Sequence, residues 1–175
     1  ACNVFWQVGG AVNVGTGTFL RGTIVANGQI DLTSTLDTLE GRALAMNAPV
    51  LVSQVVAYTP IGCGSPYLTG PAAPALGSTA TYGVFSSIGA VTSTPVTYVL
   101  GDVGANSTIP TGFNPLNVTG AIRAMNPLTA ATAGDLTNVY NYLVAMPADI
   151  DLLDPANLGH DLVLTPHSYQ IKGIT

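Results

Sequence analysis

The chain has 175 residues, enough for one domain with a sizeable core or for parts of two. It combines 47% hydrophobic residues with only 7% charged ones, and its four basic residues stand against nine acidic ones. This balance leaves no electrostatic footprint for nucleic acid or an anionic membrane surface, and no apolar run reaches the roughly 18 residues of a membrane span. We therefore expect a secreted or cell-surface β-rich protein whose polar surface comes from Thr, Ser, Asn and backbone amides.

Three similar segments open the chain, each with a short apolar run, a Gly or Asn turn and a second apolar run. The first runs are 3–8, 22–27 and 41–46, and the second runs are 11–14, 29–33 and 49–52. They recur about every 19 residues, a period typical of a β-solenoid, in which stacked turns build the core together. Because the first runs are apolar at both parities, we expect them to be buried on both faces, with a helix lying alongside.

Residues 59–75 form a linker, with four prolines and three glycines between Thr59 and Pro74. The linker divides the chain into a section of coils, 1–58, and a section of strands plus a helix, 76–175. The expected strands of the second section are 81–87, 90–94, 96–100, 116–124 and 161–172. Apolar residues at helical spacing predict a helix over 130–146, with Thr132 and Asp135 as a capping box and Pro147 as its stop.

Cys2 and Cys63 are too few for a four-ligand zinc site and stand in no Cys-x-x-Cys motif. Given the secreted type of composition, we expect a disulfide between the first coil and the linker, with two buried free thiols as the alternative. The chain begins at Ala1 without the basic-then-apolar pattern of a signal peptide. We expect a mature protein, a processed fragment or an excised segment.

Motifs along the chain resemble a known family, the DUF3494 ice-binding (antifreeze) proteins. Four segments are similar to the C-terminal half of that family: Cys2–Gly9, Gly15–Phe19, Gly22–Ala26 and Leu39–Ala45. Five further segments are similar to its N-terminal half: Leu76–Phe85, Gly101–Gly104, Val118–Ile122, Asp135–Tyr142 and Leu164–Tyr169. The resemblance implies a mainly β fold, a right-handed β-helix with one α-helix packed alongside. It also implies a secreted protein that binds ice without a catalytic group or cofactor.

The two halves stand in inverted order, and the middle strands of the family, expected after Tyr169 and before Cys2, are missing. The chain therefore spans a junction between tandem domains, or it is a permuted, shortened unit that its neighbour completes. In the second case, strands after Tyr169 of one chain would stack on residues 3–8 of the next and form a filament. The expected seam residues are Val4, Phe5, Trp6, Tyr169 and Ile171.

Ice binding, as the resemblance implies it, needs a flat, rigid face of regularly spaced polar and methyl-bearing side chains. If the valines, isoleucine and leucine of the second runs point inward, alternation sends Asn13, Asp31, Thr33 and Leu51 outward. The expected ice- or surface-binding residues are Asn13, Thr16, Thr18, Asp31, Thr33, Thr35 and Thr38. Asp31 and the large Leu51 interrupt the regularity, and threonine is also an ordinary strand residue.

The sequence offers little for catalysis or metal binding. His160 and His167 have no nearby Cys or Glu pattern, and Asp149, Asp151 and Asp154 lack the glycine and glutamate of a calcium loop. We expect no metal and no cofactor. The predicted function is a non-enzymatic, extracellular β-solenoid of ice-binding type, one unit of a tandem or polymeric surface protein.

The alternative is a structural or adhesive filament subunit that keeps the fold without binding ice. Its partners would be neighbouring copies or adjacent tandem domains. A carbohydrate-active β-helix is disfavoured, because paired carboxylates on adjacent coils are not evident.

Overall fold

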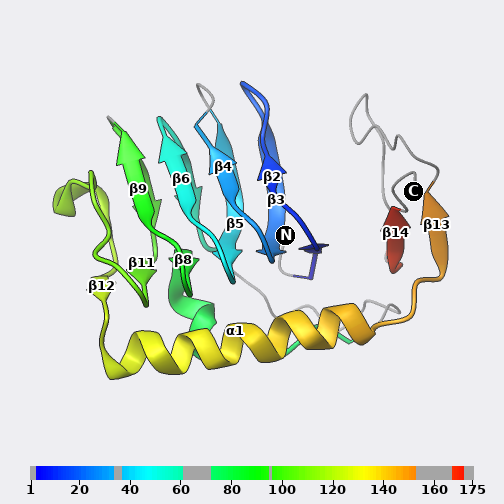
Figure 1. Ribbon diagram of the computed structural model, residues 1–175. Coiled ribbons are helices and arrows are strands. Elements are labelled where there is room, and N and C mark those ends of the chain that lie inside the picture. The colour runs from blue at the N-terminus through cyan, green and yellow to red at the C-terminus, as the bar shows by residue number, and fades with distance from the viewer. Residues whose placement is uncertain (1–2, 34–36, 61–71, 95, 153–166, 172–175) are drawn as a thin grey trace.

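The computed structural model describes residues 3–33, 37–60, 72–94, 96–152 and 167–171. These residues form parallel β-sheets and one long α-helix (Figure 1). The strands are β1 Phe5–Val8, β2 Val12–Asn13, β3 Phe19–Ala26, β4 Ile30–Leu32, β5 Thr38–Ala45, β6 Val50–Ser53, β7 Val56–Tyr58, β8 Tyr82–Ser86, β9 Val91–Thr94, β10 Tyr98–Leu100, β11 Asp102–Ala105, β12 Ile122–Ala124, β13 Ile150–Leu152 and β14 Tyr169–Ile171. The helices are α1 Pro127–Ala145 and the short 3-10 helices η1 Gly77–Thr81 and η2 Pro115–Asn117.

Eight strands form the large sheet, in the order β1-β3-β5-β8-β11-β12, with β7 pairing with β5 and β10. Every pairing is parallel. β5 and β8 lie on opposite sides of the linker in sequence, yet Ala43 pairs with Val84 and Leu44 with Phe85. The segments before and after the linker therefore contribute neighbouring strands to one sheet.

The second runs of the three predicted coils, together with β9, form a separate four-stranded parallel sheet, in the order β2-β4-β6-β9. Its register aligns Val12 with Ile30, Ile30 with Val50, and Val50 with Val91. A buried apolar cluster joins this sheet to the large sheet, and the predicted inward direction of the second runs is confirmed. The members of the cluster include Val14, Ile24, Ile30, Leu32, Ala43, Val50, Val52, Val84, Val91 and Val103.

Helix α1 lies along the other face of the large sheet (Figure 1). Leu136 and Val139 of the helix pack in a second buried cluster with Val25 and Leu44. Ile24, next to Val25, belongs to the first cluster instead. The strands are therefore buried on both faces, and the predicted helix alongside them is confirmed.

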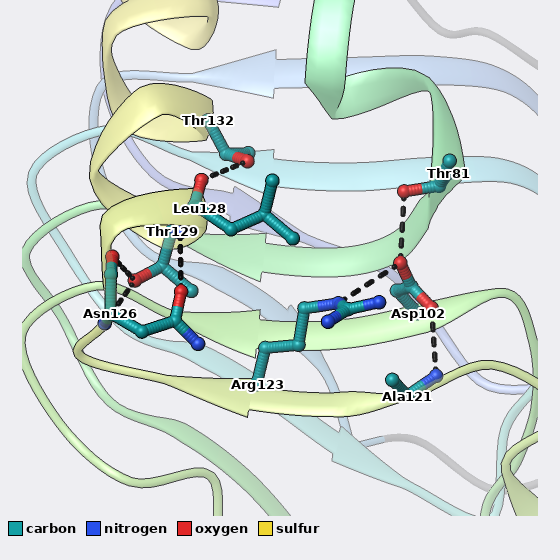
Figure 2. A network of polar contacts seen from close by, with 8 residues as sticks. All are labelled: Thr81, Asp102, Ala121, Arg123, Asn126, Leu128, Thr129 and Thr132. Atoms are coloured by element: carbon teal, nitrogen blue, oxygen red, sulfur yellow. Dashed lines mark hydrogen bonds and ion pairs between the residues drawn. The ribbon is translucent and has the colours of Figure 1, made fainter.

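The start of α1 differs from the prediction. Asn126 caps the helix: its side chain accepts from Thr129 N at 2.9 Å, and Asn126 N donates to Thr129 Oγ1 at 2.9 Å (Figure 2). Pro127 follows at the first helical position, where proline costs no hydrogen bond. The predicted capping box at Thr132 and Asp135 is wrong, because Thr132 lies one turn further on and donates to Leu128 O at 2.9 Å.

Asp135 has a different role, which is to hold η1. Its carboxylate accepts from the backbone N–H and the hydroxyl of Ser78, both at 2.7 Å. These hydrogen bonds, the one from the hydroxyl first, lower the pKa of Asp135 below its ordinary value. Arg42 of β5 fixes the other end of η1 by donating to Ala80 O at 2.9 and 3.0 Å. The short helix η1, which follows the predicted linker in sequence, is therefore anchored by both α1 and the large sheet.

Several strands of the second section also differ from the prediction. Strand 116–124 is limited to β12, because Pro115–Asn117 form a 3-10 turn capped by Asn114. β11 and β13 were not predicted, and neither was β7 of the first section. β11 begins at Asp102, whose carboxylate accepts from Thr81 Oγ1 at 2.9 Å and Ala121 N at 2.7 Å and forms an ion pair with Arg123 at 3.5 Å (Figure 2). This network joins three successive segments of the sheet.

Candidate functional site

The outer face of the four-stranded sheet carries a regular row of side chains. The sheet register places Asn13 of β2 beside Asp31 of β4, Asp31 beside Leu51 of β6, and Leu51 beside Thr92 of β9. A bridge from Thr92 to Thr111 continues the row by one residue. Neighbouring strands of a sheet are about 4.8 Å apart, so the row repeats at that interval.

A second row of hydroxyl groups runs beside the first. Ser53 of β6 pairs with Thr94 of β9, and Thr33 directly follows Leu32, whose partner Val52 directly precedes Ser53. The hydroxyl groups of Thr33, Ser53 and Thr94 therefore come from three successive strands. Thr33 and Thr94 are exposed, and Ser53 is half-buried.

Buried side chains beneath this face, and a close contact between two turns at its end, support it. Ile30, Val50 and Val91, one residue away from the first row, have no exposed surface. At the turn before β9, a Cβ atom on Gly89 would lie 2.1 Å from backbone atoms of Ala48, so only glycine permits this approach of the two turns. The face therefore rests on a closely packed interior.

The structure separates the predicted surface-binding residues into three places. Asn13, Asp31 and Thr33 lie on the face just described. Thr16 and Thr18 lie in the connection between β2 and β3. Thr38 belongs to the large sheet, and Thr35 lies outside the described residues.

Thr38 is the first residue of β5. Its row on the outer side of the large sheet is Phe19, Thr38, Val56 and Tyr98. Phe19, Val56 and Tyr98 are exposed by 54%, 40% and 46%. Apart from Thr38, this second face is therefore bulky and apolar, in contrast to the mostly short side chains of the four-stranded sheet.

Two of the predicted hydroxyl groups also make hydrogen bonds within the protein. Thr33 donates from its hydroxyl and from its backbone N–H to Asp31 Oδ1, at 2.5 and 3.0 Å. Thr18 donates from its hydroxyl to Gly15 O at 2.6 Å, and its backbone N–H donates to Asp37 Oδ1 at 3.0 Å. Both hydroxyl oxygens keep lone pairs that water can use, but their orientations are set by the protein.

Sequence reasoning missed Ser53, Thr92, Thr94 and Thr111 as members of the face. The run 90–94 was predicted as a strand, and its alternation places Val91 and Ser93 on the inner side. What the sequence did not reveal is that β9 pairs with β6 from across the linker. Alternation in 90–94 was the one signal that could have identified Thr92 and Thr94.

The predicted seam residues lie on two different sheets. Val4, exposed by 38%, precedes β1, and Phe5 and Trp6 are half-buried residues of β1. Tyr169 and Ile171 belong to β14, which pairs with β13 in a separate two-stranded sheet. The predicted disulfide partners Cys2 and Cys63 lie outside the described residues.

Other features of the described residues add no chemistry to this picture. A hollow of about 300 Å³ lies between α1 and the turns of the sheets, and its lining is uncharged: Met46, Asn47, Ser87, Ile88, Asn106, Ala133, Gly134 and Thr137. Across the described ranges, no three His, Cys, Asp or Glu side chains gather as a metal ion would require. None of the helices in the described part of the chain has the length and apolar character needed to cross a bilayer.

Comparison with known proteins gives two matches. Residues 1–57 match the ice-binding-like family. The crystal structure of an ice binding protein from an Antarctic bacterium, Flavobacteriaceae, is similar to the chain with 47% sequence identity and a TM-score of 0.55. The match covers 96% of this chain but 40% of that one, so this chain spans less than half the length of that protein. A search of the curated proteins finds no match.

The two matches agree with the resemblance found in the sequence, and the second extends across both sides of the linker. Together they support the assignment of the chain to the ice-binding family.

Proposed function

We propose that the chain binds ice through the outer face of the four-stranded sheet. The observation that carries the proposal is the register of this sheet, which aligns Asn13, Asp31, Leu51 and Thr92 in one row over a buried floor. Most of these side chains are short, and the face is supported by a close-packed interior that resists deformation. A rigid, nearly uncharged surface of this kind suits an extended, ordered partner such as ice.

Threonine is suited to the task for a physical reason. Its hydroxyl group exchanges hydrogen bonds with surface water, while its methyl group disfavours bulk-like disorder in the water beside it. Thr33, Thr92 and Thr94 supply both groups on the proposed face. Asp31 and Leu51 depart from this chemistry, and we expect them to weaken recognition relative to a row of threonines.

We also propose a β-helical architecture for the chain. The two sheets would be faces of one right-handed β-helix, because the chain passes between them with a nearly constant step. The distance along the sequence from Val12 to its partner Ile30 is nearly equal to the distance from Ile30 to its partner Val50. A β-helix explains why each turn adds one strand to each sheet and why α1 can cover one side along its length.

We also propose that the chain acts outside the cell as a section of a longer tandem protein, with the coil section, the linker and the strand-plus-helix section as its divisions. The low content of charged residues supports the first part. The length of the similar protein, of which this chain spans 40%, supports the second. Ice binding does not depend on either statement, since the proposed face lies within the described residues.

A matched pair of substitutions tests the site. Thr92→Tyr places a large ring in the row of the four-stranded sheet, and Thr38→Tyr places the same ring on the large sheet, at a residue that is equally half-buried. Thermal hysteresis and ice-recrystallisation inhibition are measured for both variants and the parent chain. We expect Thr92→Tyr to lose most of the activity and Thr38→Tyr to keep it, with circular dichroism showing both to be folded.

The reverse result, in which only Thr38→Tyr is impaired, would move the site to the large sheet. A folded parent chain without any ice activity would sink the proposal. That outcome would favour the alternative, a structural or adhesive filament subunit.

A further inference from the structure

Helix α1 and the turns that follow β5, β8 and β11 line a hollow of about 300 Å³. The helix runs across the strands of the large sheet, and three of its residues, Ala133, Gly134 and Thr137, reach the hollow (Figure 1). The volume is at the lower end of the range for small-molecule sites, and none of the described residues that line the hollow is charged. None of them belongs to the proposed ice-binding face.

A buried hydroxyl group at this hollow has no partner within the protein. Ser87 is the middle one of three aligned turn residues, since the strands that lead into these turns are paired up to their last residues. On one side, Met46 has no side-chain nitrogen or oxygen; on the other, Asn106 Oδ1 accepts from the hydroxyl of Thr129 at 3.2 Å. The Ser87 hydroxyl is therefore buried without a hydrogen bond. Because proteins leave few such groups unpaired, this one points to an occupant of the hollow.

Two asparagine side chains at the hollow each keep polar atoms for an additional partner. Asn47 donates from Nδ2 to Asn27 Oδ1 at 2.6 Å, which leaves its own Oδ1 as an acceptor. The residue aligned with Asn47 on the next turn is Ile88, whose side chain has no polar group. Asn106 accepts with Oδ1, so its Nδ2 keeps two N–H groups as donors. The hollow thus offers an acceptor, donors and a hydroxyl on turns that the sheets hold in place.

A glycine within α1 keeps the hollow open. Glycine in the interior of a helix is destabilising relative to alanine, so its presence at position 134 calls for a reason. A Cβ atom on Gly134 would meet no atom within 4 Å, so no neighbouring group excludes a side chain there. Packing within the protein does not account for the glycine. An occupant of the hollow does account for it.

We propose that the hollow binds a small, neutral polyhydroxy molecule with a single ring, such as a monosaccharide. Sugar hydroxyl groups both donate and accept, which matches the asparagine amides and the Ser87 hydroxyl. The C–H faces of such a ring match the apolar part of the lining, which is Met46, Ile88 and Ala133. A charged ligand would lose water without gaining an opposite charge. The inference goes beyond ice binding and does not depend on it, because the two sites share no residue.

D-glucose is the probe for this site, and binding is followed by NMR spectroscopy of the backbone amides of the isotope-labelled chain. We expect saturable shifts at Ser87, Asn106 and Thr137, and none at Thr92 of the proposed ice-binding face. The dissociation constant should lie in the millimolar range, because a small ligand makes few contacts. D-glucuronate, which adds a carboxylate to the same ring, should bind at least about tenfold more weakly.

Gly134→Leu is the variant that fills the hollow. Leucine favours the helix more than glycine does and displaces no neighbour here, so we expect a higher Tm together with the loss of glucose binding. Loss of binding in a more stable protein cannot be due to unfolding. Ala131→Leu is the matched control, because Ala131 is an exposed residue of the same helix that does not line the hollow. This control should bind glucose as the parent chain does.

Ser87→Ala tests the polar contact by itself. The variant removes a hydroxyl that has no partner in the protein, so its Tm should not fall. Its affinity for glucose should drop about tenfold, the usual effect of one lost hydrogen bond. Three results would overturn the proposal: a parent chain without saturable shifts around the hollow, shifts that persist in Gly134→Leu, or equal affinities of Ser87→Ala and the parent chain.

Discussion

Leu136 is the residue through which we can best measure the contact between α1 and the large sheet. Its side chain has no exposed surface and packs in the cluster that contains Val25, Leu44 and Phe85. Leu136→Ala removes three carbon atoms from this cluster, and such truncations cost about 2–5 kcal/mol, depending on how far the site collapses. Because Leu44 and Phe85 belong to paired strands that cannot move independently, we expect about 3 kcal/mol.

For a chain of this size, each kcal/mol lowers Tm by about 2–4 °C, so Leu136→Ala should melt about 6–12 °C below the parent chain. Thermal unfolding is followed by circular dichroism, with Val144→Ala as the control. Val144 lies on the same helix and is exposed by 56%, so its truncation should change the free energy of unfolding by less than about 0.5 kcal/mol. Equal melting temperatures for Leu136→Ala and Val144→Ala would refute the assignment of α1 to the core.

Two further predictions concern the caps of α1 and η1. Asn126→Ala removes the side chain that accepts from Thr129 N and should destabilise the chain by about 1 kcal/mol; an unchanged urea midpoint would contradict the cap. Asp135 has a lowered pKa in the folded state, so its charge contributes stability above about pH 4, and that contribution is lost as the pH falls towards the folded-state pKa. Asp135→Asn should therefore lose less Tm than the parent chain between about pH 5 and about pH 3, and identical pH profiles would argue against the contact with Ser78.

The first section of the chain was predictable because its information is local. Strict alternation at Ile30 and Leu32, and again at Val50 and Val52, determines the inner side of the four-stranded sheet within a few residues. The apolar residues at both parities around Val25 required a second packing surface, which α1 provides. Period and parity were sufficient for these features, since each sequence repeat places its apolar residues in the same order.

The second section was harder for two physical reasons. β11, with Gly104 at its centre, has little β propensity of its own and is held by the pairing of Val103 with Val84 and Ile122. The pairing of Val50 with Val91 crosses the linker, and no local pattern signals such a contact. This nonlocal pairing is what adds Thr92 and Thr94 to the candidate face, so the face was predicted only in its first part.

The arrangement of the layers also explains why we favour the outer face of the four-stranded sheet, and not the outer face of the large sheet, as the ice-binding site. One side of the large sheet packs on the core and much of its other side packs on α1, while its outlying strands β7 and β10 and the start of β3 carry exposed side chains. Their outward row, Phe19, Thr38, Val56 and Tyr98, combines large side chains with the small side chain of Thr38. A row that varies so much in height cannot meet a flat surface along its whole length. The four-stranded sheet has its core on one side and, apart from Leu51, short side chains on the other, so among the described residues it offers the flatter face for an ordered partner.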